Sequence, residues 1–256
     1  MSSLRILLAE DNAVNQKVVL RMLEKLGYTA DVAQNGEEAA SLARNAPYDV
    51  IFMDLMMPRM DGFEATGVIR HAENGSHRSH IIALTANAMG ADRSRCMEAG
   101  MDDFMTKPFM LETLKQKLAS VEANADGPSQ PAAATSAESV IDRSVLRSLA
   151  VMMDDDDTAY VKELLSDYLA DAERLRGEIY RSVTEGDAET LRRASHTLKS
   201  NSATFGAVEL ADLCADIEQH AVKNEIDAVR DLLTVFENRL AAFHSALVDT
   251  VETNTY

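Results

Sequence analysis

The sequence predicts two folded parts, an α/β domain with a doubly wound five-stranded parallel sheet and an all-α antiparallel four-helix bundle. Three observations lead to this fold class. Short apolar runs alternate with amphipathic stretches through residue 119, and helical periodicity without proline follows residue 141. Between them the chain is rich in Ala, Ser, Pro and Gly. We therefore expect domains at 1–119 and 141–250, a flexible linker at 120–140 and a tail at 251–256.

Five apolar runs in the first part are candidates for buried parallel strands. The run Val50-Ile51-Phe52-Met53 is apolar on both faces, as a strand covered by helices on both sides must be. The expected strands are Leu4–Ala9, Tyr28–Ala33, Asp49–Asp54, His80–Thr85 and Met101–Thr106.

An amphipathic stretch follows each expected strand. Val14, Val18, Met22 and Leu26 recur at helical spacing and predict a helix over 14–26. The other expected helices of this part cover 36–44, 61–71, 88–99 and 109–119. Five βα units in series imply helices on both faces of one parallel sheet.

The second part shows helical periodicity over 142–151, 156–183, 187–204, 207–222 and 225–248. Four of these stretches are long and closely spaced, which predicts the antiparallel bundle. The tract Asp154-Asp155-Asp156-Asp157 resembles a metal site in composition. We interpret it instead as an N-cap with favourable charge in the first helical turn.

The charge distribution argues against DNA or an anionic membrane as a partner. The formal net charge is −17. Residues 1–119 carry 13 basic and 16 acidic side chains, whereas residues 120–256 carry 12 and 26. Both kinds of polyanionic surface require a cationic protein face.

No apolar run approaches the ~20 residues that span a bilayer, and we expect no direct membrane insertion. The N-terminus lacks a signal-peptide pattern. Cys96 and Cys214 form neither a metal motif nor a disulfide framework. These features predict a reducing, cytoplasmic setting.

Polar residues end the expected strands at what should be one edge of the sheet. Glu10 and Asp11 follow the first strand, Asp54 and Thr85 end the third and fourth, and Lys107 follows the fifth. Ligands of open α/β sheets bind beyond the carboxyl ends of the strands. Converging carboxylates repel one another, and a hard cation such as Mg²⁺ relieves that repulsion. Asp54 could then attack phosphorus while the cation, the Thr85 hydroxyl and Lys107 share the phosphoryl charge.

These residues lie in segments that resemble a response-regulator receiver domain across residues 4–119. The matching segments are Ile6–Asn12, Met53–Gly62, Leu84–Ala88 and Ala99–Pro108. The resemblance implies a sheet with strand order 2-1-3-4-5 and a cis Lys107-Pro108 peptide.

The resemblance also implies a role for each residue of the site. Asp54 would be the phospho-acceptor, and Asp11 and Asp54 would ligate Mg²⁺. Glu10 would act on the cation mainly through water, and the backbone carbonyl of Met56 would complete the metal site. Thr85 and Lys107 would bind the phosphoryl group. Phe104 takes the place of an aromatic switch residue, often Tyr in this family, so any switch here must act by packing alone.

His196 is the second candidate for chemistry. At 100° per residue, an apolar stripe lies between about 160° and 220° around the helix from His196, which therefore points to the exposed side. The stripe consists of Leu191, Ala194, Leu198 and Phe205. Three cations and two small residues lie within about 60° of His196 on the same count: Arg192, Arg193, Lys199, Ser200 and Ala203. An imidazole is a competent nucleophile near neutral pH, and the cations would offset phosphoryl charge.

The segment His196–Ala207 resembles the motif of a histidine phosphotransfer (HPt) domain, within a similarity that covers residues ~141–248. The resemblance implies that His196 is a phospho-acceptor and Lys199 its charge partner. Many family members have Gly where this chain has Ser200, which is still small enough to permit close approach.

The two parts together predict a phosphorelay protein. Asp54 would receive phosphate from an upstream histidine kinase, and His196 would pass it to a downstream response regulator after receiver–HPt contact within or between chains. The sequence contains no glycine-rich nucleotide lid, so we expect a phosphotransfer intermediate, either stand-alone or part of a hybrid kinase. We expect docking through Val14, Asn15 and Val18 on the receiver. On the HPt side we expect docking through the residues around His196, namely Arg192, Arg193, Ser200 and Ala203. Two alternatives stay open: a phosphate sink, and a receiver-gated binding module.

Overall fold

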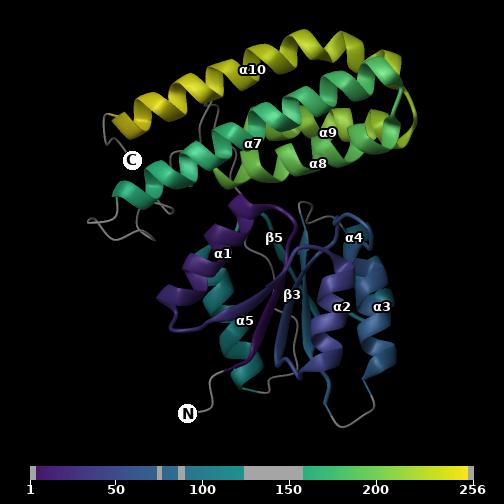
Figure 1. Cartoon of the computed structure of the whole chain (residues 1–256), viewed down its shortest axis with the longest axis vertical. Coiled ribbons are helices and arrows are strands. Elements are labelled where there is room, and N and C mark those ends of the chain that lie inside the picture. The colour runs from purple at the N-terminus through teal and green to yellow at the C-terminus, as the bar shows by residue number, and fades with distance from the viewer. Residues whose placement is uncertain (1–3, 74–76, 86–89, 124–157, 253–256) are drawn as a thin grey trace. The chain divides into compact units, whose positions relative to one another are not determined.

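The structure is a computed structural model of the 256-residue chain and describes residues 4–73, 77–85, 90–123 and 158–252 (Figure 1). The chain divides into two compact units, with the boundary between Ala134 and Thr135. None of the helices in the described residues is long and apolar enough to cross a membrane.

The first unit contains the expected parallel sheet. Its strands are β1 (Ile6–Ala9), β2 (Ala30–Ala33), β3 (Val50–Asp54), β4 (His80–Thr85) and β5 (Asp103–Thr106). The strand order is β2-β1-β3-β4-β5, and every neighbouring pair is parallel, so the predicted topology is confirmed. All residues of the two central strands β1 and β3 are buried, which explains why these runs are apolar on both faces.

Helices cover both faces of this sheet (Figure 1). They are α1 (Ala13–Lys25), α2 (Gly36–Asn45), α3 (Gly62–Ala72), α4 (Gly90–Ala99) and α5 (Leu111–Glu122). Figure 1 shows α1 and α5 on one face and α2 and α3 on the other. Helix α5 continues three residues into the segment expected as linker, and the Tyr28 hydroxyl binds its last residue, Glu122, at 2.8 Å.

Side-chain caps explain where three of these helices begin. Asn12, Asn35 and Asp61 each accept hydrogen bonds from backbone N–H groups of the first turn. These groups have no partner within the helix, so a cap at this position stabilises the first turn by roughly 1 kcal/mol. Asn12 and Asp61 therefore begin α1 and α3 directly beside the ends of β1 and β3.

The second unit contains four helices: α7 (Thr158–Glu185), α8 (Ala188–Thr204), α9 (Val208–Val222) and α10 (Ile226–Glu252). Each packs against the next, and α10 returns to α7, as in the expected antiparallel bundle. Helix α10 enters the expected tail by two residues. The helix expected over 142–151, the cap at Asp154–Asp157 and the linker from residue 124 onward lie outside the described residues.

An aromatic cluster fills the middle of the bundle. The Tyr168 ring lies 4.7 Å from the Phe205 ring and 5.8 Å from the Phe243 ring, between centroids. These contacts join α7 to α8 and α10. The apolar stripe predicted on α8 is buried throughout, at no more than 2% exposure, which confirms the orientation assigned to that face of the helix.

Gly62 and Gly67 of α3 allow a matched test of how closely the start of this helix approaches the end of β3. A Cβ on Gly62 would lie 2.1 Å from the backbone oxygen of Asp54, whereas a Cβ on Gly67 would meet nothing within 4 Å. We expect Gly62→Ala to destabilise the first unit by roughly 1–3 kcal/mol through overpacking. Gly67→Ala should be neutral or stabilise by roughly 0.5–1 kcal/mol. Hydrogen exchange of the β1 and β3 amides measures both changes, and equal effects would contradict the close approach.

Candidate functional site

The carboxyl edge of the sheet carries four buried polar side chains, each from a different strand. Glu10 directly follows β1, Asp54 ends β3, Thr85 ends β4, and Lys107 directly follows β5. None is more than 7% exposed. Since adjacent parallel strands end at the same edge, residues distant in sequence become neighbours there.

Lys107 joins the two buried carboxylates. Its Nζ donates to Glu10 Oε2 and to Asp54 Oδ2, at 2.8 Å each. The three side chains are between 1% and 4% exposed, so water contributes little to their solvation. The backbone N–H of Lys107 also donates to the Thr85 carbonyl at 2.7 Å, which ties the end of β5 to the end of β4. The Lys107-Pro108 peptide is cis, as the family resemblance implied.

Burial and charge shift the pKa values of this cluster. Burial raises the pKa of Glu10, the Asp54 charge raises it further, and Lys107 opposes both, so that it reaches about 8. Burial lowers the pKa of Lys107, but the charges of Asp54 and Glu10 outweigh that cost and hold it above its usual range. Lys107 therefore stays cationic, and one cation faces more carboxylate charge than it can neutralise.

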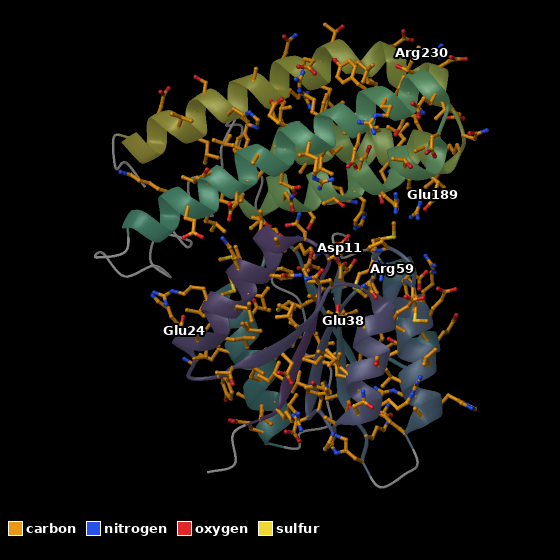
Figure 2. All side chains as sticks on the ribbon, viewed as in Figure 1. Asp11, Glu24, Glu38, Arg59, Glu189 and Arg230 are labelled. Atoms are coloured by element: carbon orange, nitrogen blue, oxygen red, sulfur yellow. The ribbon has the colours of Figure 1, made fainter. Side chains whose placement is uncertain are left out.

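The surplus of negative charge suits a divalent cation. Glu10, Asp11 and Asp54 each offer one carboxylate oxygen, and these oxygens lie within 4.8 Å of one another. An all-oxygen donor set of this kind fits a hard cation such as Mg²⁺. Asp11 is half-buried and reaches the cluster from the loop after β1; Figure 2 labels it at this edge of the sheet.

Two other residues implied by the resemblance lie on neighbouring loops and strands. The Met56 backbone N–H donates to Asp54 Oδ1 at 3.3 Å, so the Met56 backbone lies beside the Asp54 carboxylate. Phe104 on β5 is half-buried, and the Lys117 ammonium lies 5.7 Å from its ring centroid. Lys117 also pairs with Asp103 at 2.6 Å, a partner of this strand that sequence reasoning did not find.

The residues expected to dock a partner on α1 are placed differently from that expectation. Asn15 is 1% exposed, and its amide donates to Glu10 Oε1 at 3.0 Å. Its side chain therefore supports the acidic cluster, and burial does not support the docking role expected for it, which stays a prediction. Asn12 caps the same first turn of α1, from which the Asn15 side chain extends to Glu10. Val14 and Val18 are each 2% exposed, so exposure does not support their docking role, which stays a prediction.

The second site lies on the bundle, where His196 and Lys199 of α8 meet Glu218 of α9. His196 Nδ1 lies 2.8 Å from Glu218 Oε1, and Lys199 Nζ donates to Glu218 Oε2. The His196 side chain is 12% exposed. The sequence predicted an exposed His196 surrounded by cations. This prediction is wrong in two respects, because the side chain is mostly covered and its nearest charged partner is a carboxylate.

The other residues expected around His196 have mixed environments. Arg193 is exposed, whereas Arg192 pairs with Glu189 one turn earlier. Ala203 is half-buried, and Ser200 is only 2% exposed. A helical count describes one helix and ignores its neighbours, which is why it misjudged these positions. Glu218 could have been suspected because it lies one turn after buried Cys214, at the border of the apolar face of α9.

Glu218 is strongly ionised in this setting. Burial raises its pKa, but the hydrogen bond and charge of His196 and the charge of Lys199 outweigh burial and lower the pKa to about 2. A carboxylate at Oε1 accepts from a protonated Nδ1. That arrangement leaves Nε2 of His196 as the ring nitrogen with the free lone pair.

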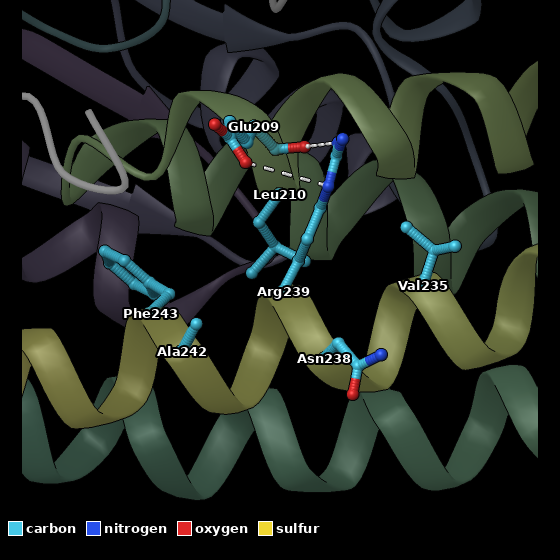
Figure 3. A pocket seen from close by; sticks show the side chains of 7 residues that line it. All are labelled: Glu209, Leu210, Val235, Asn238, Arg239, Ala242 and Phe243. Carbon is cyan, nitrogen blue, oxygen red and sulfur yellow. Dashed lines mark hydrogen bonds and ion pairs between the residues drawn. The ribbon is translucent and has the colours of Figure 1, made fainter. Parts of the chain in front are cut away.

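A hollow lies between α9 and α10, apart from the two candidate sites (Figure 3). Arg239 spans it and donates to the Glu209 carbonyl at 2.8 Å. The residues that line this hollow include neither His196 nor Glu218, so it is separate from the histidine site.

Ionised Glu218 should stabilise the bundle in a pH-dependent way. Its folded pKa of about 2 lies below its ordinary value of 4.5. The stabilisation, of order 3 kcal/mol, should be complete above pH 4.5 and lost as the pH falls through about 2. We expect Glu218→Gln to unfold at lower urea than the wild type at pH 6, with a smaller difference at pH 2. The Leu198 methyl signals in NMR report the unfolding of α8, and an unchanged difference would contradict this role.

Comparison with known proteins agrees with the two-unit architecture. The family model of the response regulator receiver domain matches residues 6–119, and that of the Hpt domain matches residues 163–246. A hybrid signal transduction histidine kinase K of Dictyostelium discoideum is 41% identical over 120 residues, which cover 44% of this chain and 10% of that protein. Histidine protein kinase 1 of Candida albicans is 45% identical over 127 residues, covering 46% of this chain and 5% of that protein.

A solved receiver domain of a sensor histidine kinase from Pseudomonas aeruginosa is 44% identical and covers 48% of this chain and 99% of its own, with a TM-score of 0.44. This chain spans about a tenth or less of the length of the two curated relatives described above. The family models cover the sheet domain and most of the described bundle, and they follow one another in the order predicted from the sequence. The chain therefore carries a response regulator receiver domain at residues 6–119 followed by an Hpt domain at residues 163–246.

Proposed function

We propose that this chain is a phosphorelay intermediate with two phospho-acceptors. Asp54 receives a phosphoryl group from a histidine kinase, His196 takes it from Asp54, and a downstream receiver domain takes it from His196. The observation that carries this proposal is that one chain holds two kinds of acceptor. The Asp54 carboxylate lies beside Lys107, and the His196 imidazole is held at Nδ1 by Glu218. Both acceptor types needed for alternating transfer are present in one chain. The curated relatives, which include hybrid histidine kinases, support the same role.

In the first transfer an oxygen of Asp54 attacks the phosphorus of a donor phosphohistidine. The O–P bond forms as the N–P bond breaks, and the leaving imidazole takes the electron pair. Lys107 already contacts Asp54 Oδ2 and neutralises part of the phosphoryl charge. We expect the Thr85 hydroxyl, at the end of the neighbouring strand β4, to donate to the same group.

A divalent cation fits the acidic cluster of Glu10, Asp11 and Asp54. We propose that it is Mg²⁺, with the backbone of Met56 completing the site. When bound, it supplies positive charge against the phosphoryl oxygens. The buried carboxylates supply the negative charge that attracts it.

In the second transfer Nε2 of His196 attacks the phosphorus held on Asp54. The N–P bond forms, the O–P bond to Asp54 breaks, and the ring becomes cationic because Nδ1 keeps its proton. Ionised Glu218 accepts from Nδ1 and stabilises that positive charge. Lys199, held at the other Glu218 oxygen, would offset part of the charge of the incoming phosphoryl group.

The relay predicts two chemically distinct phosphate pools. With a small acyl-phosphate donor, the wild type should carry base-labile phosphate on Asp54 and base-stable, acid-labile phosphate on His196. His196→Ala should lose only the base-stable pool, and Asp54→Asn should lose both. His220→Ala is the matched control, because His220 Nδ1 also lies 2.8 Å from a glutamate oxygen, of Glu225, but outside the site. Radiolabelled phosphate that remains after acid treatment and after base treatment measures the two pools. A base-stable pool in His196→Ala would overturn the assignment.

The metal site predicts a cation requirement at the first acceptor. Chelation of divalent cations, or Asp11→Asn, should slow Asp54 phosphorylation at least ~10-fold, since charge on the phosphoryl oxygens then lacks compensation. Glu24→Gln, a change at a 69% exposed side chain on α1, should have no effect. Initial rates at several Mg²⁺ concentrations measure this requirement. Rates that are independent of Mg²⁺ in the wild type would contradict it.

A further inference from the structure

Helix α8 buries a polar residue on the side facing α7. Asn201 is 0% exposed, and its amide nitrogen donates to Asp171 Oδ2 at 2.7 Å. Asp171 is held in turn by Arg174, whose guanidinium donates to Oδ1 from Nη2 at 2.6 Å and from Nε at 3.1 Å. The other oxygen of the Asp171 carboxylate is therefore bound within α7 itself.

The Asn201 contact and the His196 site lie on different sides of α8. Asn201 follows His196 by five residues, which places it about 140° around the helix. One side of α8 thus binds Asp171 on α7, and another binds Glu218 on α9. A shift of α8 by one residue would turn its side chains by about 100° and move them by about 1.5 Å, which breaks both contacts.

Apart from the apolar side chains of Leu191, Leu198 and Phe205, this buried surface carries small residues. Ala194, Ser195 and Ser202 are small and at most 2% exposed. The Ser195 hydroxyl has no hydrogen-bond partner in the part of the chain that the structure describes. Small side chains allow close helix approach but provide few protrusions that lock one helix against another. Buried polar pairs in helical interfaces commonly specify register, often with little gain in stability.

We infer that the hydrogen bond from Asn201 to Asp171 sets the register of α8 and so positions His196 beside Glu218. Asn201 acts as a positioning residue through the helix, without touching the phosphoryl group. This inference rests on the proposed function of His196.

The test uses the full chain with Asn201→Leu, which keeps the γ-branched shape but removes the polar atoms, and Ser195→Ala as the buried control on the same helix. The ¹⁵N NMR signals of the His196 imidazole and the rate of phosphoryl transfer from Asp54 to His196 are measured in each. We expect Asn201→Leu to split or shift the imidazole signals and to slow transfer roughly 10- to 100-fold, as a displacement near 1 Å can. Ser195→Ala should leave both unchanged. A single wild-type imidazole signal with a wild-type rate in Asn201→Leu overturns the inference.

If Asn201→Leu fails to fold, a second pair of variants tests the inference. Asp171→Ala removes the acceptor on α7 without altering α8 and should reproduce the altered imidazole signals, whereas Asp171→Asn retains an acceptor oxygen and should not. Wild-type signals in a folded Asp171→Ala overturn the inference. The imidazole signals are recorded without phosphate, so absence of phosphate on His196 in the wild type would count against the proposed function and leave this readout intact.

Discussion

The ion pairs of Lys107 with Glu10 and Asp54 are the interaction on which the receiver site depends. Three side chains from three strand ends share one buried space, and each carboxylate would be costly there without the cation. The bodies of β1 and β3 carry only apolar side chains, so the charges of these two strands lie at the carboxyl edge. In the proposed relay the same burial favours phosphoryl transfer to Asp54, because little water would compete with the phosphoryl group for Lys107.

The Hpt domain solves a related problem with different parts. Its proposed acceptor, His196, lies on one helix and the stabilising carboxylate of Glu218 on the next, so helix packing sets the distance between them. Glu218 holds both His196 and Lys199, and its depressed pKa keeps it ionised whenever the imidazole is a nucleophile. In the proposed relay the Asp54 carboxylate of the receiver is the acceptor and Lys107 supports it. In the Hpt domain the Glu218 carboxylate is the support, and the His196 imidazole is the proposed acceptor.

Several elements of this arrangement could be predicted from residue order alone. The five βα units and the positions of Asp54, Thr85 and Lys107 follow from alternating periodicity and from polar residues at strand ends, whereas the strand order was implied by the family resemblance. The buried face of α8 followed from its 3.6-residue period. These features depend on spacing along one element or on the known meeting place of parallel strands. The roles of Asn15, Glu218 and Asn201 could not be found in this way, because each depends on a partner from another element.

The sequence by itself thus determined the two fold classes, their order and the two candidate acceptors. Periodicity dictates which face of an element is buried, and parallel strands end at one edge whatever their loops contain. Only the tertiary structure decided that Asn15 turns toward Glu10, that His196 is mostly covered and that Glu218 is its partner. The physical reason is that a hydrogen bond needs its two atoms about 3 Å apart. Packing between separate helices sets such distances, and no count along a single helix contains them.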